Sequence, residues 1–542
     1  MSFDIANVDR DFPFKEFRDG QKEAIEFIIS AINNGKKYIF LEAPTGSGKS
    51  PIGLTLAKMA NQSFYVTTTK ILQDQLVKDF GRSELIELKG RNAYECTYRK
   101  ANAEKLRASK VISEKRYIEW KVGRYTCESG YCRSKGVSTL KECACPYQTQ
   151  LQMASASKTC LMNFSAFLCH LNFTHHFGHP NTSGPSRELI VIDECHNIES
   201  QILDFVSLTI SEAVLDGQSI PVFESASEYA KWIVLNDIEG MIASEIIKAI
   251  KSEDIKKADD LTQLKNKIAT FVAEQNHDKN WVAEFSDGRM FKSVCLKPVY
   301  VSKYAHEYLF RHTDIVVMMS ATILDVNVMS RALGIPKEMI AAKRMKSRFP
   351  VANRPIYFKP AAKMTGGKSN MHKWSGQLVK GVDAIIAKYQ NVRGIIHTHN
   401  FAIAELLMEE SSHKERFVFQ KNYPDKFEML KAHARKEGSI IVAPAMHEGI
   451  DLKDDLSRFQ IVCKVPFPNF YENKQLAARK EADPAFYDWL VALKTCQCTG
   501  RSIRSKDDWA HTYIIDESFR WWYQRNKNML PKWFIEAVVN LD

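Results

Sequence analysis

Runs of largely apolar residues alternate along the chain with stretches whose apolar residues lie three and four positions apart. The runs predict buried strands of a parallel sheet, and the wider spacing predicts amphipathic helices. The clearest runs lie at 38–41, 63–67, 189–192, 314–319, 394–397, 439–442, 460–463 and 512–516. Helical spacing is evident over 21–29 and 71–80. This alternation predicts an α/β protein.

The alternation is interrupted by an acidic stretch at 199–280. Three segments within it have helical spacing, at 226–235, 239–250 and 261–272. We interpret the stretch as a helical insertion. The alternation resumes near Lys292, and a second α/β unit begins after Gly334.

The length of 542 residues exceeds what one hydrophobic core organises, so several domains are expected. No apolar run is long enough to span a bilayer and no signal peptide is evident, which predicts a cytosolic protein without membrane contact. In that compartment, the 12 cysteines favour metal ligands or buried thiols over disulfides.

Charge is distributed unevenly over a chain whose formal net charge is +11. Residues 89–141 contain 14 Lys and Arg against 5 Glu, whereas residues 199–279 contain 8 Lys against 15 Asp and Glu. A basic segment beside an acidic one indicates two insertions with different roles. A solvated surface is the alternative reading of the basic segment.

The strand at 38–41 leads into the sequence EAPTGSGKS at 42–50, and a helix is predicted from Ile52. Strand, glycine loop and helix form the context of a phosphate-binding loop. Ala43 stands where the strict pattern has its first glycine. A Gly/Ser turn before a helix is the alternative.

Each residue of this loop has an expected role toward ATP and Mg²⁺. Gly46, Ser47 and Gly48 let backbone N–H groups converge on an anion, helped by the helix dipole. Lys49 is expected to reach the β- and γ-phosphates, and the Ser50 hydroxyl is expected to bind Mg²⁺.

Polar residues upstream of the loop, and others after the second strand, suggest further ligand contacts. Arg18 and Gln21 can hydrogen-bond an adenine edge or its ribose, with a capped surface helix as the alternative. The sequence TTK at 68–70 suits a nucleic-acid phosphate, and N-capping by Thr69 explains it equally well.

The buried strand at 189–192 ends in Asp193-Glu194-Cys195-His196. Downstream of a phosphate loop, Asp193 is expected to hold Mg²⁺ through water, and Glu194 to orient and deprotonate the attacking water. His196 is expected to couple the nucleotide site to the neighbouring lobe.

Five cysteines lie in the basic segment, at Cys96, Cys127, Cys132, Cys143 and Cys145. Only the second and third have the close spacing usual for structural zinc. A four-thiolate iron–sulfur cluster tolerates irregular gaps, so we expect a cluster, with zinc or free thiols as alternatives. Two later cysteines, at 160 and 169, are in apolar surroundings and are interpreted as core.

The second α/β unit carries two polar segments, at 446–451 and 497–504. Arg501 and Arg504 are three positions apart, so they share a face if the segment is helical. Two guanidinium groups on one face can act as arginine fingers on a γ-phosphate across a cleft. A surface pair of salt bridges is the alternative.

The order of these segments resembles that of superfamily 2 helicases. The segments that carry the resemblance are 43–50, 193–196, 320–322, 448–451 and 497–504. The cysteine insertion and the helical insertion resemble those of the DinG/XPD iron–sulfur branch. Local matches agree, at GRNAYEC (90–96), CPY (145–147), VPFP (465–468) and GRSIRSKDD (500–508). Cys195 replaces the usual alanine of the D-E-A-H box, and Cys143 is an additional cysteine.

The resemblance implies two RecA-like lobes, with ATP in the cleft between them. Lobe 1 is expected at 1–90, 151–198 and 293–335, an iron–sulfur domain at 91–150, a helical arch at 199–292, and lobe 2 at 336–542. The implied [4Fe-4S] ligands are Cys96, Cys127, Cys132 and Cys145. The implied nucleotide contacts in lobe 2 are Glu448, Gly449, Asp451 and Gln497, with Arg501 and Arg504 as arginine fingers.

The implied activity is ATP-driven movement along single-stranded DNA, 5′ to 3′, by a monomer that unwinds tailed duplexes in a bacterial or virus-infected cytosol. RNA–DNA hybrids are a further expected substrate. Two alternatives remain: a translocase that strips protein or RNA without unwinding, and a non-catalytic clamp that ATP switches between shapes.

Overall fold

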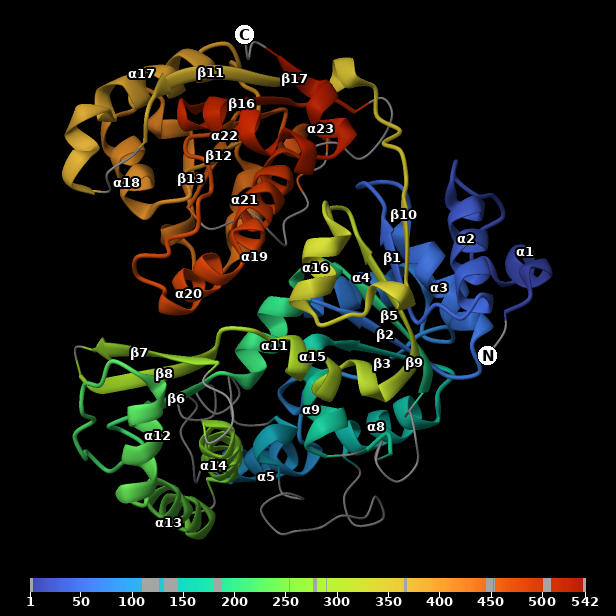
Figure 1. Cartoon of the computed structure of the whole chain (residues 1–542), viewed down its shortest axis with the longest axis vertical. Helices are drawn as coiled ribbons and strands as arrows, with labels where there is room; N and C mark the ends of the chain where they lie inside the picture. The colour runs from blue at the N-terminus through green and yellow to red at the C-terminus, as the bar shows by residue number, and fades with distance from the viewer. Residues whose placement is uncertain are drawn as a thin grey trace.

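The computed structural model describes residues 3–109, 126–130, 145–174, 176–178, 187–252, 254–275, 280–288, 290–364, 368–444, 452, 454–500 and 508–539. Two α/β lobes and a smaller insertion domain make up the molecule (Figure 1). Among the described helices, none is long and apolar enough to cross a membrane.

Lobe 1 is built on a seven-stranded sheet in the order β10-β1-β9-β5-β2-β4-β3, with every pairing parallel. Its strands are β1 (Tyr38–Glu42), β2 (Ser63–Thr67), β3 (Ile86–Glu87), β4 (Thr159–Asn163), β5 (Arg187–Asp193), β9 (Thr313–Ser320) and β10 (Ile340–Arg344). The predicted strands at 38–41, 63–67, 189–192 and 314–319 are all present. The carboxyl ends of β1, β5 and β9 meet at one edge, where the polar residues were expected.

The sheet of lobe 1 extends further along the chain than the expected end at residue 335. β10 pairs with β1 in register, Tyr38 opposite Ile340. The Arg344 guanidinium lies 3.1 Å from the buried Glu42 carboxylate, which ties the last strand to the start of the loop.

The helices of lobe 1 cover both faces of this sheet. They are α1 (Val8–Asp11), α2 (Gln21–Asn33), α3 (Lys49–Met59), α4 (Lys70–Phe80), α8 (Pro146–Ala156), α9 (Phe164–Asn172), α11 (Ile198–Val206), α15 (Ser302–Tyr308) and α16 (Val326–Ala332). A further helix, α5 (Thr97–Ala108), belongs to the cysteine segment. The apolar residues that predicted a helix after Gly20 are buried in α2: Ala24, Ile25, Ile28 and Ile29.

Lobe 2 has a second seven-stranded parallel sheet, in the order β13-β14-β12-β15-β16-β11-β17. Its strands are β11 (Ile356–Ala362), β12 (Gly394–His397), β13 (Phe417–Phe419), β14 (Ile440–Ala443), β15 (Phe459–Val462), β16 (His511–Asp516) and β17 (Val538–Val539). Its helices are α17 (Ser375–Ile386), α18 (Phe401–Glu410), α19 (Lys426–Arg435), α20 (Lys474–Ala482), α21 (Pro484–Thr499), α22 (Ser518–Asn526) and α23 (Lys532–Ala537).

The insertion domain, residues 208–298, contains the three expected helices and a sheet that was not expected. The helices are α12 (Ala226–Leu235), α13 (Ile238–Lys251) and α14 (Ile255–Gln275). The strands β6 (Leu208–Ser211), β7 (Trp281–Asp287) and β8 (Lys292–Pro298) form an antiparallel sheet in the order β6-β8-β7. Buried and half-buried residues alternate along β8, so no continuous apolar run marks it in the sequence.

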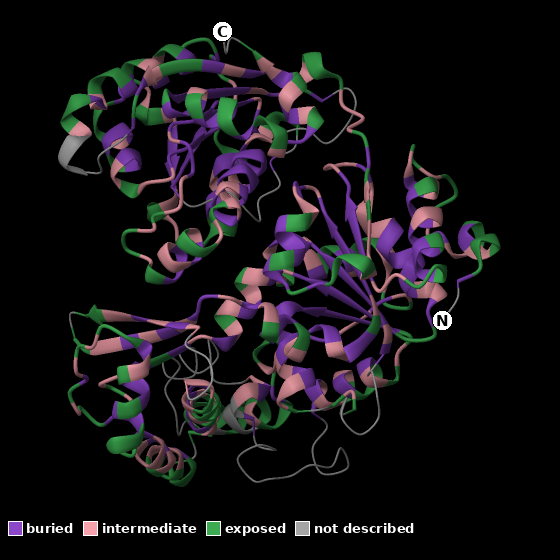
Figure 2. Ribbon diagram, in the orientation of Figure 1, coloured by how far each residue is buried: buried purple, intermediate pink, exposed green. Residues whose placement is uncertain are grey.

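Buried residues concentrate in the strands of both large sheets and in the helices between the lobes (Figure 2). The aromatic segment of α22 belongs to this core: Phe519, Trp522 and Tyr523 are buried, whereas Trp521 is exposed.

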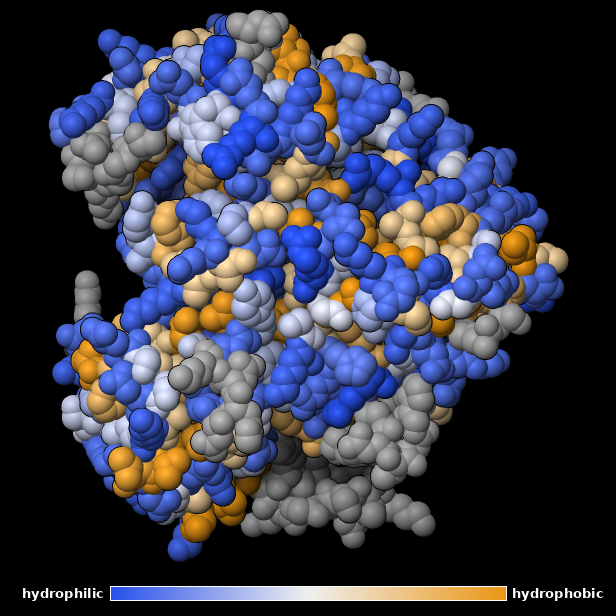
Figure 3. Space-filling view, in the orientation of Figure 1, coloured by the Kyte–Doolittle hydropathy of each residue, from blue (hydrophilic) through white to orange (hydrophobic). Residues whose placement is uncertain are grey.

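Lobe 2 contacts both lobe 1 and the insertion domain through α20 and α21. The Trp489 indole N–H donates to the Ile323 carbonyl of lobe 1, at 2.8 Å. The Gln475 backbone N–H donates to the Glu284 carboxylate of the insertion domain at 3.3 Å, and its side-chain amide donates to the Val299 carbonyl of lobe 1 at 3.1 Å. Beside this contact, the surface is notched between lobe 2 and the insertion domain, at the left of Figure 3.

Candidate functional site

The loop between β1 and α3 has the backbone of a phosphate-binding loop. Gly46 and Gly48 adopt left-handed φ values of 79° and 80°, which favour glycine. The helix α3 starts at Lys49, and no side chain caps its N-terminus. No side chain therefore competes with an anion for its first backbone N–H groups.

Arg18 and Gln21 hold this loop from outside. The Arg18 guanidinium donates to the Gly46 carbonyl at 3.0 Å, and the Gln21 amide donates to the Gly48 carbonyl at 3.0 Å. The other end of the Gln21 amide accepts from the Arg18 backbone N–H. Gln21 is buried and Arg18 lines the cavity described below, so the geometry gives Gln21 a role in positioning the loop.

The carboxylate pair lies at the end of β5, beside this loop. The Asp193 carboxylate accepts from the backbone N–H of Glu194 at 2.9 Å, and Glu194 has a left-handed φ of 54°. Burial and the Glu194 charge raise the pKa of Asp193 to about 6, and the Lys49 ammonium opposes this rise. A buried carboxylate beside a hydroxyl and a lysine is the donor set expected of a Mg²⁺–phosphate site.

His196 connects this site to lobe 2. Its Nε2 atom lies 2.7 Å from the side-chain amide nitrogen of Gln497, and its Nδ1 atom lies 2.8 Å from the Ser320 hydroxyl oxygen. Because an amide nitrogen only donates, Nε2 accepts and Nδ1–H donates to Ser320. The Ser320 hydroxyl also accepts from the Thr322 backbone N–H. The segments 193–196 and 320–322 and Gln497 therefore form one polar network.

A cavity of about 690 Å³ lies between the lobes at this network. Lobe 1 lines it with the expected residues Gly46, Gly48, Lys49, Ser50, Asp193 and Glu194, and lobe 2 with Gln497, Thr499 and Gly500. The cavity continues to Thr68 and Thr69, at the start of α4. Thr69 caps α4, which confirms the N-capping reading: its hydroxyl accepts from the Leu72 N–H. The same residue lines the cavity.

Several lining residues were not anticipated from the sequence. Arg354, Lys426 and Trp533 come from the segment between the lobes, from α19 and from α23. They stand alone in sequence, without a local pattern, and only the tertiary fold brings them to the cavity.

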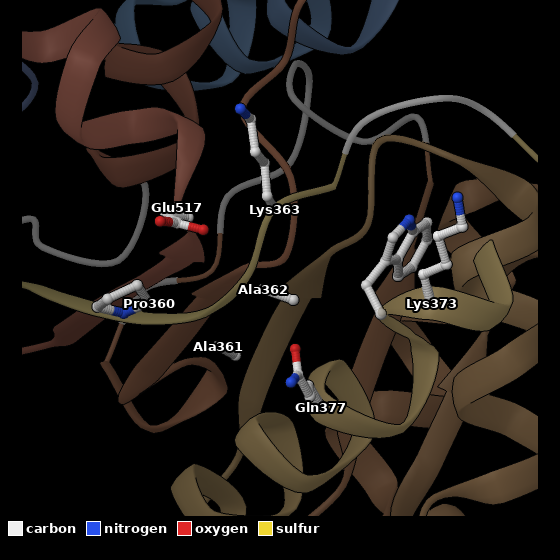
Figure 4. A pocket seen from close by; sticks show the side chains of 8 residues that line it. Pro360, Ala361, Ala362, Lys363, Lys373, Gln377 and Glu517 are labelled. Atoms are coloured by element: carbon white, nitrogen blue, oxygen red, sulfur yellow. The ribbon is translucent and has the colours of Figure 1, made fainter. Parts of the chain in front are cut away.

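A second cavity, of about 620 Å³, lies in lobe 2 at the end of β11 (Figure 4). Its lining includes Lys363, Lys373, Gln377 and Glu517. No residue expected to bind nucleotide reaches it, so it does not compete with the interlobe cavity as the nucleotide site.

Three of the expected cluster ligands converge below lobe 1. Cys96, Cys127 and Cys145 are all buried, and the last two sulfur atoms lie 3.6 Å apart. Burial and then the neighbouring Cys145 raise the pKa of Cys127 to about 12. Within the described ranges, no group of three His, Cys, Asp or Glu residues has the arrangement of a metal site. The three thiols are soft sulfur donors of the kind that binds a cluster. Their sulfur atoms do not surround a common metal position in this structure.

Other predicted residues lie outside the described part of the chain. They are Cys132, Cys143, Glu448, Gly449, Asp451, Arg501 and Arg504. Of the two cysteines interpreted as core, Cys160 is fully buried and Cys169 is partly exposed.

Two family models match the chain. Residues 14–217 match the model described as "Type III restriction enzyme, res subunit", and residues 393–537 match "Helicase C-terminal domain". The first covers the phosphate loop and the carboxylate pair, and the second covers Gln497 and most of lobe 2.

Curated relatives match over shorter stretches. The chain is 30% identical over 123 residues to the ATP-dependent DNA helicase CHL1 of Candida albicans, which covers 19% of this chain and 14% of that protein. It is 28% identical over 123 residues to the general transcription and DNA repair factor IIH helicase subunit XPD/RAD3 of Saccharomyces cerevisiae, covering 21% and 15%. The matches thus span about 15% of these relatives' own length.

Solved structures match over nearly the whole chain. One titled as an XPD helicase has a TM-score of 0.63 at 16% identity, covering 95% of this chain and 99% of that one. The structure of S. tokodaii Xpd4 has a TM-score of 0.58 at 12% identity, covering 96% and 100%. At these identities the likeness concerns the fold.

Proposed function

We propose that this chain, which belongs to the DinG/XPD-like family of superfamily 2 helicases, is an ATP-driven DNA helicase that moves along single-stranded DNA. One observation carries the proposal. The phosphate loop and the carboxylate pair of lobe 1 share a cavity with lobe 2, and His196 links the two lobes by a hydrogen bond.

ATP is proposed to bind with its phosphates on the loop at 46–50. The backbone N–H groups and the Lys49 ammonium would hold the β- and γ-phosphates. Ser50 and Asp193 would hold Mg²⁺, which when bound neutralises the charge on the transferring phosphate. Glu194 is partly exposed at the cavity, where it would orient the attacking water and take its proton.

The coupling to movement is proposed to run through His196. Its two ring nitrogens bond to Ser320 in lobe 1 and Gln497 in lobe 2, so a shift of Glu194 or His196 changes the interlobe contact directly. The cavity continues to Thr68 and Thr69, at a helix N-terminus that suits a backbone phosphate of the strand. ATP and the single-stranded DNA would then both contact the interface between the two lobes.

We further propose that Cys96, Cys127 and Cys145, with Cys132, hold a [4Fe-4S] cluster. The support is the convergence of three buried thiols next to α5, whose exposed face includes Lys100, Lys105 and Arg107. The cluster would fix the fold of this segment. The helix α14 of the insertion domain contacts the turn at Cys127, so the two insertions form one surface beside lobe 1.

The proposed substrate is a duplex with a single-stranded 5′ tail, and RNA–DNA hybrids are a further candidate. Steady-state ATP turnover, measured with and without single-stranded DNA, tests the proposal. We expect turnover to rise steeply with DNA and the rise to fall with salt, because strand binding releases counterions. An ATP turnover rate that does not change with DNA would contradict the proposal. DNA-stimulated turnover without duplex separation would indicate a translocase.

A further inference from the structure

Tyr65 lies in the middle of β2, directly beneath the nucleotide site, and its side chain is fully buried. In the parallel sheet it stands opposite Val191 of β5. Asp193 is two residues further along β5, so its side chain leaves the sheet on the same face as Val191. The Tyr65 ring therefore lies on the face of the sheet that carries the Asp193 carboxylate.

Gly53 makes the room for this ring. A Cβ atom on Gly53 would lie 3.0 Å from Cε2 of Tyr65 and 2.9 Å from Cγ1 of Val191, both too close. Gly53 lies one turn after Ser50 in α3. The ring thus packs under the first turn of the helix that follows the phosphate loop, and Ser50 lies at the near end of that turn.

The hydroxyl of Tyr65 is buried without a completed hydrogen bond among the described residues. Its surroundings are polar. Burial and the Asp193 and Glu194 charges raise the pKa of the phenol well above its usual value, while the nearby Ser50 hydroxyl lowers it. A buried hydroxyl without a partner is unfavourable, so its retention beside these groups calls for an explanation.

We propose that the Tyr65 hydroxyl is a positioning group for the Mg²⁺–nucleotide complex. It donates a hydrogen bond to the Ser50 hydroxyl oxygen when that complex is bound, and so holds Ser50 in place beside Asp193 for Mg²⁺. This inference rests on the proposed function, because it takes Ser50 and Asp193 as the groups that hold Mg²⁺. It assigns Tyr65 no contact with the reacting atoms.

The test replaces Tyr65 by phenylalanine, which keeps the ring and removes only the hydroxyl. Affinity for ADP is measured by calorimetry on the full chain, once with excess Mg²⁺ and once with EDTA. We expect Tyr65→Phe to weaken binding of MgADP about five- to ten-fold, the size of one ordinary hydrogen bond, and to leave ADP with EDTA within about two-fold. Thermal unfolding without nucleotide is measured in parallel, and we expect Tyr65→Phe to be as stable as the wild type or more stable.

Tyr229→Phe is the matched control, since Tyr229 is a buried tyrosine of the insertion domain whose hydroxyl donates to the Pro221 carbonyl at 2.9 Å. It should lower the unfolding temperature and leave MgADP affinity unchanged. Equal MgADP affinity of wild type and Tyr65→Phe would overturn the inference, as would equal losses with Mg²⁺ and with EDTA. If the wild type itself binds no MgADP, the proposed function fails instead.

Discussion

The imidazole of His196 in lobe 1 lies 2.7 Å from the side-chain amide of Gln497 in lobe 2, across 301 residues of sequence. Both side chains are buried at the cavity between the lobes. His196 is two residues after Glu194, the proposed base, and Gln497 is close to the end of α21, which packs on lobe 1 through Trp489. Events at the γ-phosphate therefore have a short path to the second lobe.

Loss of this contact should weaken the response of ATP turnover to DNA. In Gln497→Ala the two lobes lose a buried hydrogen bond at the cavity, and we expect DNA-stimulated turnover to fall about ten-fold. Gln475→Ala is the control, because Gln475 also joins lobe 2 to lobe 1 but lies away from the cavity. Similar losses in both variants would show that general lobe docking, rather than the His196 contact, is responsible.

The loop lysine and the proposed base should each be required for hydrolysis. Lys49→Ala removes positive charge from the transferring phosphate, and Glu194→Gln removes the base. Each change should lower ATP turnover by about two to four orders of magnitude. Glu194→Gln should still bind ATP in a filter or calorimetric assay, and near-normal turnover in this variant would refute the assignment of the base.

A buried ion pair between the lobes should make stability depend on pH. Glu199 of α11 lies 3.6 Å from Arg479 of α20; Arg479 is buried, and the Glu199 side chain is 12% exposed. Burial raises the pKa of Glu199 from 4.5 to about 7, against the opposing charge of Arg479. A raised carboxyl pKa gives stability that is complete below the unfolded pKa and is lost as pH rises through the folded one.

The free energy of unfolding of the wild type should therefore fall by roughly 2–3 kcal/mol between about pH 5 and pH 7.5. Glu199→Gln should not show this fall. Chemical denaturation at a series of pH values measures it. The wild type should be more stable at the acidic end, relative to the glutamine variant. A difference between the two proteins that does not change across this range would contradict the raised pKa.

The cysteines should separate into cluster ligands and core thiols. Anaerobically purified protein is expected to be brown, with about four iron and four sulfide per chain. Cys96→Ser should lose iron, and Cys160→Ser, in a fully buried strand position, should retain it. Iron and sulfide analysis decides this. Colourless protein with stoichiometric zinc would rule out the cluster and leave the nucleotide site unaffected.

The sequence predicted those parts of the fold that short-range patterns encode. The strands from Tyr38 and Leu189 are continuous apolar runs, and α12 matches its predicted bounds of Ala226–Leu235. The loop at 46–50 and the Asp193–Glu194 pair were also predictable, because strand ends in a parallel sheet meet at one edge.

Other features depend on tertiary contacts and have no local signal. The sheet of the insertion domain is half-exposed, so β8 shows no continuous apolar run. The position of Gln21 against the loop, and the pairing of Glu199 with Arg479, join segments that the sequence gives no reason to pair. A role for the Tyr65 hydroxyl also could not be predicted, since an aromatic residue in a buried strand usually indicates packing alone.

Strand displacement tests the central claim most directly. Wild-type protein and Glu194→Gln are incubated with ATP and duplexes that carry a single-stranded tail at the 5′ or the 3′ end, and released strand is measured over time. We predict that the wild type separates the 5′-tailed duplex, leaves the 3′-tailed duplex intact, and loses activity in Glu194→Gln. Absence of strand release from every tailed duplex, in protein that hydrolyses ATP, would contradict a helicase, and release from the 3′ tail alone would contradict the proposed direction.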